Sequence, residues 1–262
     1  MTRPQEDYLG NREADSVVHS PWFGSIALDF LVLGDAHACP YLPGRVAREE
    51  FFSSVEFDPE LYHDFMDAGF RRSGLVFYRP RCRECSECRS LRVVCKDFRL
   101  TKSYRRVLRK NGDISLSIGK PRLTTDKMRM YTDYLSFQHA SSRANSPEDL
   151  ERFLYQTPVR TLEMEYRVRG NLVCVSIGDV CSRSLSSVYV FFDPDHGRRS
   201  LGTLSAISEV LLCQDRGIPF YYLGFYIEGC DAMNYKARFK PHEVLSSSRI
   251  WEPRKMSRLV PH

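Results

Sequence analysis

Three cysteines spaced every third residue, Cys82, Cys85 and Cys88, lie inside the strongly basic stretch RPRCRECSECRSLR. Cysteine thiolates bind soft metal ions, and they also react with oxidants. Neighbouring arginines stabilise the thiolate form, so they favour both kinds of chemistry. The pattern therefore predicts a metal site or a reactive-thiol site, and three thiols with a purely structural role are the alternative.

A closed metal site usually takes four protein ligands, and this cluster supplies three. A clustered ferredoxin pattern would have its fourth cysteine at the position that Arg92 occupies, so the simple ferredoxin pattern is absent and a more distant fourth ligand is possible. Cys39, in HACPYLPGR, is the first candidate, followed by Cys95 and His37. The predicted ligands of a structural zinc ion or an iron–sulfur cluster are Cys39, Cys82, Cys85 and Cys88.

Positive charge is concentrated in one part of the chain. Residues 71–110 contain fourteen Lys and Arg against three acids, a net charge of +11, whereas the whole 262-residue chain carries +5. The rest of the chain is therefore acidic. A basic segment of this kind favours a polyanion site, most readily nucleic acid. A solvated basic surface is the alternative.

Local signals predict short elements around this segment. FDPELYHDFMDAGF predicts a helix that Asp58 caps, with Pro59 in the first position and Gly69 at the end. A short strand is expected at residues 75–78. DFRLTKSYRRVLRK predicts a basic helix that stops at the turn signal Asn111-Gly112, and a strand follows.

The second half of the sequence predicts two helices and then a β-α-β unit. The helices are expected at residues 124–140 and 145–156, the second with Ser146 at its cap. Strands are expected from Leu172, Ser186 and Pro219, with a helix over residues 200–217 between the last two. The loop DPDHGRRSLGT enters that helix with basic residues and Gly202, which suits a phosphate or a developing negative charge.

Five separated motifs occur along the chain in a fixed order: CPYLPGR at 39–45, FRRSG at 70–74, YRPRCRECSECRSLRV at 78–93, SLGT at 200–203 and LGFYIEGCDAMNYKARFKPHEVL at 223–245. Together they resemble the aminoacyl-tRNA–protein transferases. This family comprises the eukaryotic arginyl-tRNA–protein transferases and the bacterial aspartate/glutamate leucyltransferases of the N-degron pathway. The compact length resembles the leucyl branch.

The resemblance implies an α+β fold with an N-terminal cysteine-containing subdomain and an acetyltransferase-like (GNAT-type) mixed sheet with flanking helices. The expected divisions are a tail at 1–20, a basic cysteine-containing region at 21–123, a transferase region at 124–251 and a tail at 252–262. No apolar run is long enough for a membrane span, and the first residues lack an apolar signal core. We expect a cytoplasmic protein without membrane association.

The implied reaction transfers an amino acid from charged tRNA to a protein that begins with Asp or Glu. The ester is already activated, and an α-amine with a pKa of about 7.7–8.0 is partly neutral at pH 7. The enzyme must align the two groups, stabilise an oxyanion and move one proton, so no cofactor is required for the chemistry. Lys236 is the candidate that polarises the ester, and Glu228, Asp231 and His139 are candidates for the proton.

The two substrates call for different side chains. The acceptor carboxylate needs a cation, and the arginine fork matches it in two hydrogen bonds, so Arg72 and Arg79 are the first candidates, followed by Lys236 and Arg238. The tRNA end needs phosphate contacts and an aromatic platform. Tyrosines that could stack on the terminal base are Tyr222, Tyr226 and Tyr235, with the sheet core as the alternative for the first two. Candidates for tRNA binding are Arg105, Arg106, Arg109, Lys110, Arg198, Arg199 and Gly202.

Three alternatives stay open at this point. The same reaction could use arginyl-tRNA, because Glu228 and Asp231 could pair with an arginine side chain. The chain could be a non-catalytic, zinc-dependent RNA-binding module, although such a module would not need the motif at 223–245. A small-molecule N-acetyltransferase would favour a loop richer in glycine than RRSLGT.

Overall fold

The computed structural model describes residues 31–138 and 146–253. The predicted N-terminal tail, His139 and residues 254–262 of the predicted C-terminal tail lie outside these ranges. Within the described ranges, no helix is both long and apolar enough to cross a lipid bilayer.

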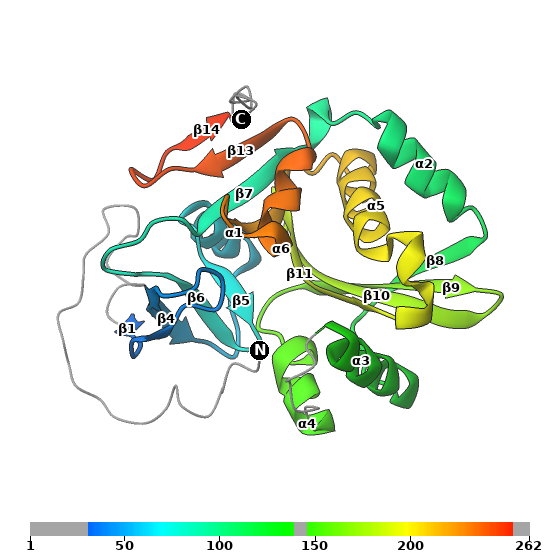
Figure 1. Cartoon of the computed structure of the whole chain (residues 1–262), viewed down its shortest axis with the longest axis horizontal. Helices are drawn as coiled ribbons and strands as arrows, with labels where there is room; N and C mark the ends of the chain where they lie inside the picture. The colour runs from blue at the N-terminus through cyan, green and yellow to red at the C-terminus, as the bar shows by residue number, and fades with distance from the viewer. Residues whose placement is uncertain (1–30, 139–145, 254–262) are drawn as a thin grey trace.

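An eight-stranded sheet forms the larger part of the fold (Figure 1). The parallel pair β11 and β12 is joined by helix α5 (Leu201–Asp215), whereas the other paired neighbours are antiparallel. In spatial order the strands are β14 (Trp251–Pro253), β13 (His242–Leu245), β7 (Arg89–Val94), β12 (Phe220–Tyr226), β11 (Ser184–Phe192), β10 (Asn171–Val180), β9 (Thr161–Val168) and β8 (Ile114–Gly119). The predicted α+β class, the mixed sheet and its β-α-β unit are confirmed.

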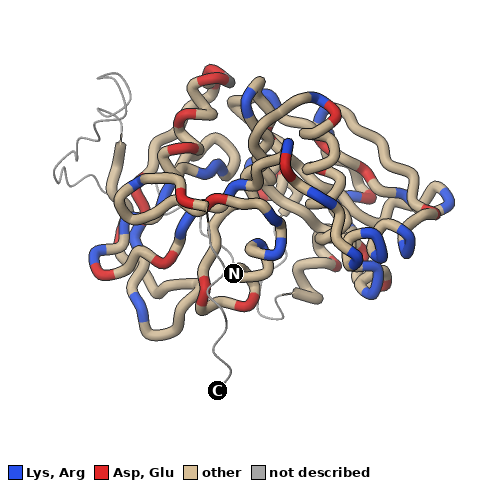
Figure 2. Tube along the Cα trace, turned by 90° about the horizontal axis from the view of Figure 1, so that it is seen from above, with Lys and Arg blue, Asp and Glu red and all other residues tan. Residues whose placement is uncertain are grey.

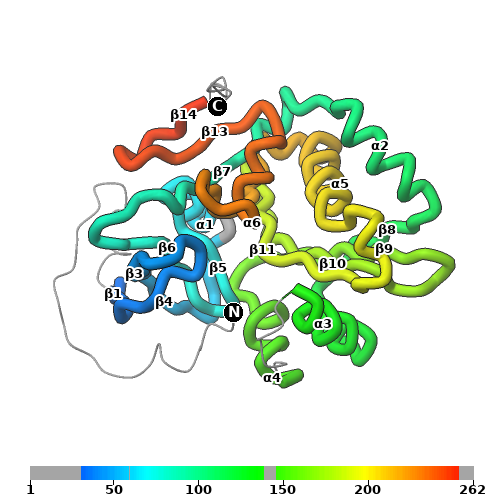
Figure 3. Tube along the Cα trace, viewed as in Figure 1, coloured from blue at the N-terminus to red at the C-terminus, as the bar shows by residue number. Residues whose placement is uncertain are grey.

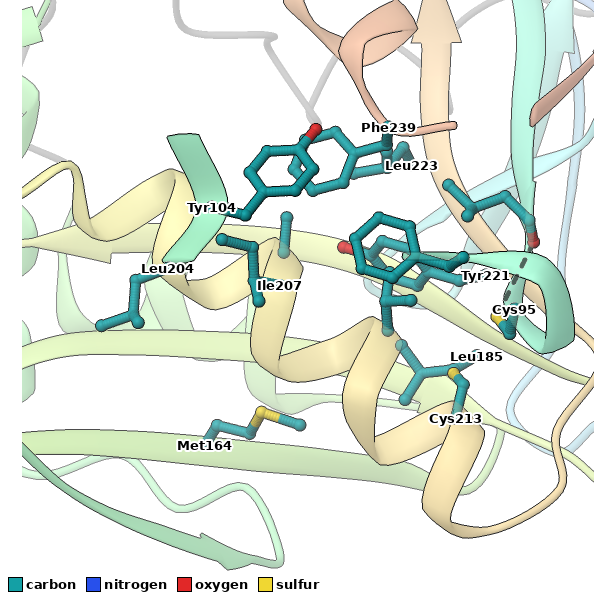
Figure 4. Close-up of a cluster of buried hydrophobic side chains, with 14 of the residues drawn as sticks. Cys95, Tyr104, Met164, Leu185, Leu204, Ile207, Cys213, Tyr221, Leu223 and Phe239 are labelled. Atoms are coloured by element: carbon teal, nitrogen blue, oxygen red, sulfur yellow. Dashed lines mark hydrogen bonds between the residues drawn. The ribbon is translucent and has the colours of Figure 1, made fainter. Parts of the chain in front are cut away.

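Helices cover both faces of this sheet (Figure 1). On one face, α5 packs against β11 and β12. Its Leu204 and Ile207 (Figure 4) belong to a buried apolar cluster that also contains Cys174 of β10. On the other, α3 (Thr125–Gln138) and α4 (Pro147–Leu150) bury a second cluster that includes Val175 and Ile177 of β10. Alternate residues of β10 thus face opposite layers, as a strand buried on both sides requires.

A second, four-stranded sheet lies beside the first, with α1 (Pro59–Asp67) next to it (Figures 1 and 3). The cap signals of α1 are confirmed: Asp58 accepts from the amides of Glu60 and Leu61 at 2.7 and 3.1 Å. Gly69 follows the helix at φ 88°, a conformation that favours glycine. The strands are β1 (Val32–Leu33), β4 (Glu49–Ser53), β6 (Val76–Pro80) and β5 (Arg71–Ser73), and β2 (His37–Ala38) pairs separately with β3 (Val46–Ala47).

The strands of the two sheets are not separated in sequence at residue 123, the expected boundary between the two regions. β7 and β8 belong to the large sheet, and α2 (Lys102–Lys110), which lies between them in sequence, packs against α5. Strand β7 was not predicted from the sequence, because a charged residue such as Arg92 is unusual in a strand that has a neighbour on each side. The Arg92 guanidinium is neutralised there by Asp67 at 2.5 Å and Glu243 at 2.7 Å. The division of the chain into domains stays a prediction, but β7 and β8 lie in the same eight-stranded sheet as β9 to β12.

Short helical segments complete the described chain. They are η2 (Cys95–Asp97), η3 (Glu151–Tyr155), η4 (Pro194–Arg199), α6 (Asp231–Asn234) and η5 (Tyr235–Arg238). In the view of Figures 1 and 3, α6 appears between the four-stranded sheet and α5. The α6 and η5 segments belong to the longest of the motifs and carry several of the candidate residues.

Candidate active site

The parallel strands β11 and β12 separate part of the way along their length. They pair only from Ser184 to Ser186, although both strands continue beyond this point. Arg71 of β5 reaches the place where they part: its Nη1 donates to Ser186 Oγ at 2.7 Å, and its Nη2 donates to the Ser187 carbonyl. Gly224 leaves room for this guanidinium, because a Cβ at Gly224 would lie 3.4 Å from Arg71 Nη2. Sequence reasoning did not select Arg71, although FRRSG contains it.

Lys236 is buried close to Arg71. Its Nζ donates to the Phe225 carbonyl at 2.7 Å and contacts Met233 Sδ at 3.3 Å. Burial lowers the pKa of Lys236 to about 7, and the positive charge of Arg71 acts in the same direction. An appreciable fraction of this amine is therefore neutral near pH 7, so Lys236 can accept a proton as well as donate a hydrogen bond.

A fully buried carboxyl group, that of Glu209 on α5, also lies near this site. It accepts from Tyr221 Oη and from Ser205 Oγ, the latter at 3.2 Å. Burial raises the pKa of Glu209, which favours its neutral form. Burial also raises the pKa of Tyr235, and the charge of Glu209 adds to this effect. Glu209 was missed because it stands among the apolar residues of α5.

The other candidates from the longest motif lie at the surface. Glu228 is 61% exposed, with an oxygen 3.9 Å from Arg89, and Asp231 is exposed and accepts from Asn234 Nδ2 at 3.1 Å. Both carboxylates are therefore accessible to solvent. Arg238 is exposed as well.

Arg72 and Arg79 are buried and already paired. Arg72 donates to both carboxylate oxygens of Asp179 at 2.7 Å, and both side chains are fully buried. Arg79 pairs with the buried Glu50. The structure therefore gives Arg72 a partner inside the fold and no exposed surface for a substrate.

The four candidate metal ligands come together in space. Cys39, Cys82, Cys85 and Cys88 all line one cavity, whereas Cys95 lies in the core and donates to the Val93 carbonyl. Four thiol groups are a donor set that suits zinc or an iron–sulfur cluster. Among the described residues, however, no group of three or more His, Cys, Asp or Glu has the arrangement of a metal site.

The effect of the neighbouring arginines on the thiols differs from the prediction. Burial raises the pKa of Cys82, and it raises the pKa of Cys88 to about 12, with the other cysteines adding to the effect. Desolvation is the largest cause of the raised pKa for both thiols. Arg45 Nη1 donates to Cys85 Sγ at 3.2 Å. Without a bound metal, Cys82 and Cys88 are therefore neutral thiols near pH 7.

The predicted tRNA-binding residues form neighbouring surface segments. Lys110, at the end of α2, donates to the Arg198 carbonyl, and Arg199 makes two hydrogen bonds with Asp113 at 2.8 and 2.9 Å. These contacts bring the basic helix next to the loop before α5. The remaining basic candidates on α2, all exposed, are Arg105, Arg106 and Arg109.

Other basic and aromatic candidates have different surroundings. Along the trace, Lys and Arg positions occur in both halves of the molecule rather than at one end (Figure 2). Gly202 lies in the first turn of α5 with open space around its Cβ position. Tyr222 and Tyr226 are buried in β12, so the core alternative holds for them, and Tyr235 keeps 37% exposure.

Comparison with known proteins matches both halves of the chain to one family. The family model described as "Arginine-tRNA-protein transferase, N terminus" matches residues 37–106, and its C-terminal counterpart matches residues 126–246. A protein of Alkalilimnicola ehrlichii named aspartate/glutamate leucyltransferase is 36% identical over 217 residues, which cover 81% of this chain and 91% of the relative. A protein of Sinorhizobium medicae with the same name is 37% identical over 229 residues, covering 82% and 88%.

Solved structures are more distantly similar. A GCN5-related N-acetyltransferase from Kribbella flavida matches with a TM-score of 0.33 and 12% identity, covering 74% of this chain and 60% of that one. The sequence matches identify the class of the protein as an aminoacyltransferase. The chain belongs to the aminoacyl-tRNA–protein transferase family.

Proposed function

We propose that this chain transfers leucine from leucyl-tRNA to the N-terminal α-amine of proteins that begin with Asp or Glu. The names and the high coverage of the relatives support this specificity. The proposal also places the protein in the N-degron pathway of the cytoplasm.

One observation favours leucine over arginine as the donor amino acid: the side chains of Glu228 and Asp231 are exposed. An arginine side chain would need a buried carboxylate partner, and neither of these residues offers one. The buried carboxyl group of Glu209 is favoured in its neutral form and is engaged by Tyr221. An apolar donor side chain such as that of leucine needs no such carboxylate partner.

The proposed reaction forms one amide bond and breaks one ester bond. The neutral α-amine of the acceptor attacks the ester carbonyl, the C–N bond forms, and the C–O bond to the tRNA ribose breaks. One proton leaves the attacking nitrogen, and one is needed on the departing ribose oxygen. Lys236 suits both transfers because its pKa of about 7 lies close to the working pH. Arg71 supplies positive charge near the developing oxyanion.

The basic surface of α2 and the loop before α5 is our proposed binding site for the tRNA end. Phosphate contacts from exposed arginines and lysines dominate the affinity of such surfaces. Tyr235 is the proposed stacking partner for the terminal base, because part of its ring is accessible. In this arrangement the aminoacyl ester would enter where β11 and β12 separate.

A structural zinc ion or an iron–sulfur cluster on Cys39, Cys82, Cys85 and Cys88 stays a prediction. When bound, it would hold the cysteine loop against the segment that contains Cys39. The transfer chemistry does not require it. The RNA-binding module without catalysis is disfavoured, because the C-terminal half matches the transferase family over residues 126–246.

A transfer assay that compares leucyl-tRNA with arginyl-tRNA as the donor tests this proposal. Purified protein should transfer leucine from leucyl-tRNA to a peptide that begins with Asp, and it should leave arginyl-tRNA unused at equal concentration. Transfer of arginine alone would keep the reaction and reject the leucyl donor. Absence of transfer from both donors, with folded protein, would reject the proposed activity.

A further inference from the structure

A cavity of about 210 Å³ lies between the cysteine loop, β12 and the turn after β13. Phe225 of β12 lines it, and Lys236 Nζ is bound to the Phe225 carbonyl at 2.7 Å. The cavity is thus close to the residue that we propose to handle the proton.

Positive charge dominates the walls of this cavity. Five arginines line it, Arg45, Arg79, Arg81, Arg89 and Arg249, against one glutamate, Glu49, which pairs with His37 at 2.9 Å.

Three of these arginines share a single carboxylate. Glu50 pairs with Arg79, lies 3.7 Å from Arg81 and attracts Arg249. Three guanidinium groups around one carboxylate leave an excess of positive charge in a partly buried space. A second carboxylate in the cavity would relieve this repulsion.

Two polar side-chain atoms in the cavity wall could donate hydrogen bonds to such a carboxylate. Among the residues that the structure describes, Arg249 Nη1 and Ser90 Oγ are buried atoms without a hydrogen-bond partner. Unsatisfied buried donors are uncommon and unfavourable, so their presence in one cavity indicates a missing acceptor. Arg249 is held by a tight turn, in which its amide donates to the Ser246 carbonyl at 3.0 Å and its φ is 61°.

We propose that this cavity binds the side-chain carboxylate of the acceptor's N-terminal Asp or Glu, with Arg249 and Ser90 as its hydrogen-bond donors. Arg81 adds positive charge from the cavity wall. This inference rests on the proposed function. It assigns acceptor specificity to Arg249 in place of Arg72 and Arg79, whose guanidinium groups are occupied by Asp179 and Glu50.

The test compares leucine transfer to peptides that begin with Asp, Glu, Asn or Ala. Wild-type protein should prefer Asp over Asn. Arg249→Gln should raise the KM for the Asp peptide by about 10–100-fold, the range for one hydrogen bond to a charged group, and leave the KM for leucyl-tRNA unchanged. The ratio of kcat/KM between Asp and Asn peptides should fall by the same factor. Arg129→Gln is the matched control, because Arg129 pairs with Asp126 at the surface and lines no part of the cavity.

The outcomes separate this inference from the function it rests on. If wild-type protein transfers no leucine to any peptide, the proposed function fails. If wild-type protein prefers Asp and Arg249→Gln keeps both the preference and the KM, the function stands and the cavity assignment is overturned. Should Arg249→Gln fail to fold, Ser90→Ala and Arg249→Lys carry the test: each should weaken the preference for Asp over Asn, and an unchanged preference in both would reject the site.

Discussion

The Arg72–Asp179 pair joins the two sheets, and its loss should cost stability rather than substrate affinity. Arg72 is on β5 and Asp179 on β10, and both side chains are fully buried. Arg72→Met would leave Asp179 with only two of its present donors, Thr161 Oγ1 at 2.7 Å and Tyr62 Oη at 3.0 Å. The carboxylate would then stay buried without a counter-charge.

Removing one partner of a buried ion pair costs about 3–5 kcal/mol. For a chain of this size, each kcal/mol lowers the unfolding temperature by about 2–4 °C, so Arg72→Met should unfold about 6–20 °C below the wild type. Circular dichroism during heating measures this shift. The double variant Arg72→Met/Asp179→Leu should recover much of the loss, because no unpaired charge remains buried.

Substrate kinetics supply the discriminating readout for Arg72. At a temperature where Arg72→Met stays folded, the KM for the Asp peptide should equal the wild-type value within about twofold, since Arg72 has no exposed surface. An unchanged unfolding temperature together with a strongly raised peptide KM would refute this reasoning and return Arg72 to the substrate site.

Three further predictions concern the proton, the tRNA and the cysteine loop. Lys236→Met should lower kcat by about 10²–10⁴-fold, and it should remove the component of the pH–rate profile near pH 7 that belongs to Lys236, leaving the rise at about pH 7.7–8.0 that belongs to the acceptor α-amine; a variant whose kcat and profile both match the wild type would exclude Lys236 as the proton acceptor. Because the pKa of Lys236 is lowered, the unfolded state binds more protons between about pH 7 and 10.5, so wild-type stability should rise over this window relative to Lys236→Met. Arg106→Gln/Arg109→Gln should raise the KM for leucyl-tRNA and flatten its dependence on salt without changing the peptide KM, and an unaltered salt dependence would argue against this surface. Cys82→Ser/Cys85→Ser should lower both the unfolding temperature and the activity, whereas an unchanged melting curve with full activity would show that these thiols do not hold the loop.

Features fixed by local signals could be predicted from the sequence. The cap of α1 depends on Asp58, Pro59 and Gly69, which are neighbours in the chain, and the capping box of Ser146 and Asp149 at α4 is equally local. The order of elements in the β-α-β unit followed from hydrophobic periodicity in the same way.

Features fixed by distant partners could not be predicted. Arg72 looked like a substrate ligand because its partner, Asp179, lies 107 positions away in the sequence. β7 was missed because Asp67 and Glu243, which neutralise Arg92, lie far from it along the chain. Arg249 belongs to no motif, and only the folded turn after β13 brings it to the cavity. Charge alone therefore identified the basic region, whereas the fold decides which arginines are free to bind a substrate.

The most direct test of the central claim is a competition assay with both donors in one reaction. Wild-type protein would receive leucyl-tRNA and arginyl-tRNA at equal concentration together with peptides that begin with Asp, Glu and Ala, and mass spectrometry would read the products. The account predicts that the Asp and Glu peptides gain one leucyl residue and that the Ala peptide stays unmodified. Peptides extended by arginine, or an Ala peptide extended as readily as the acidic ones, would contradict it.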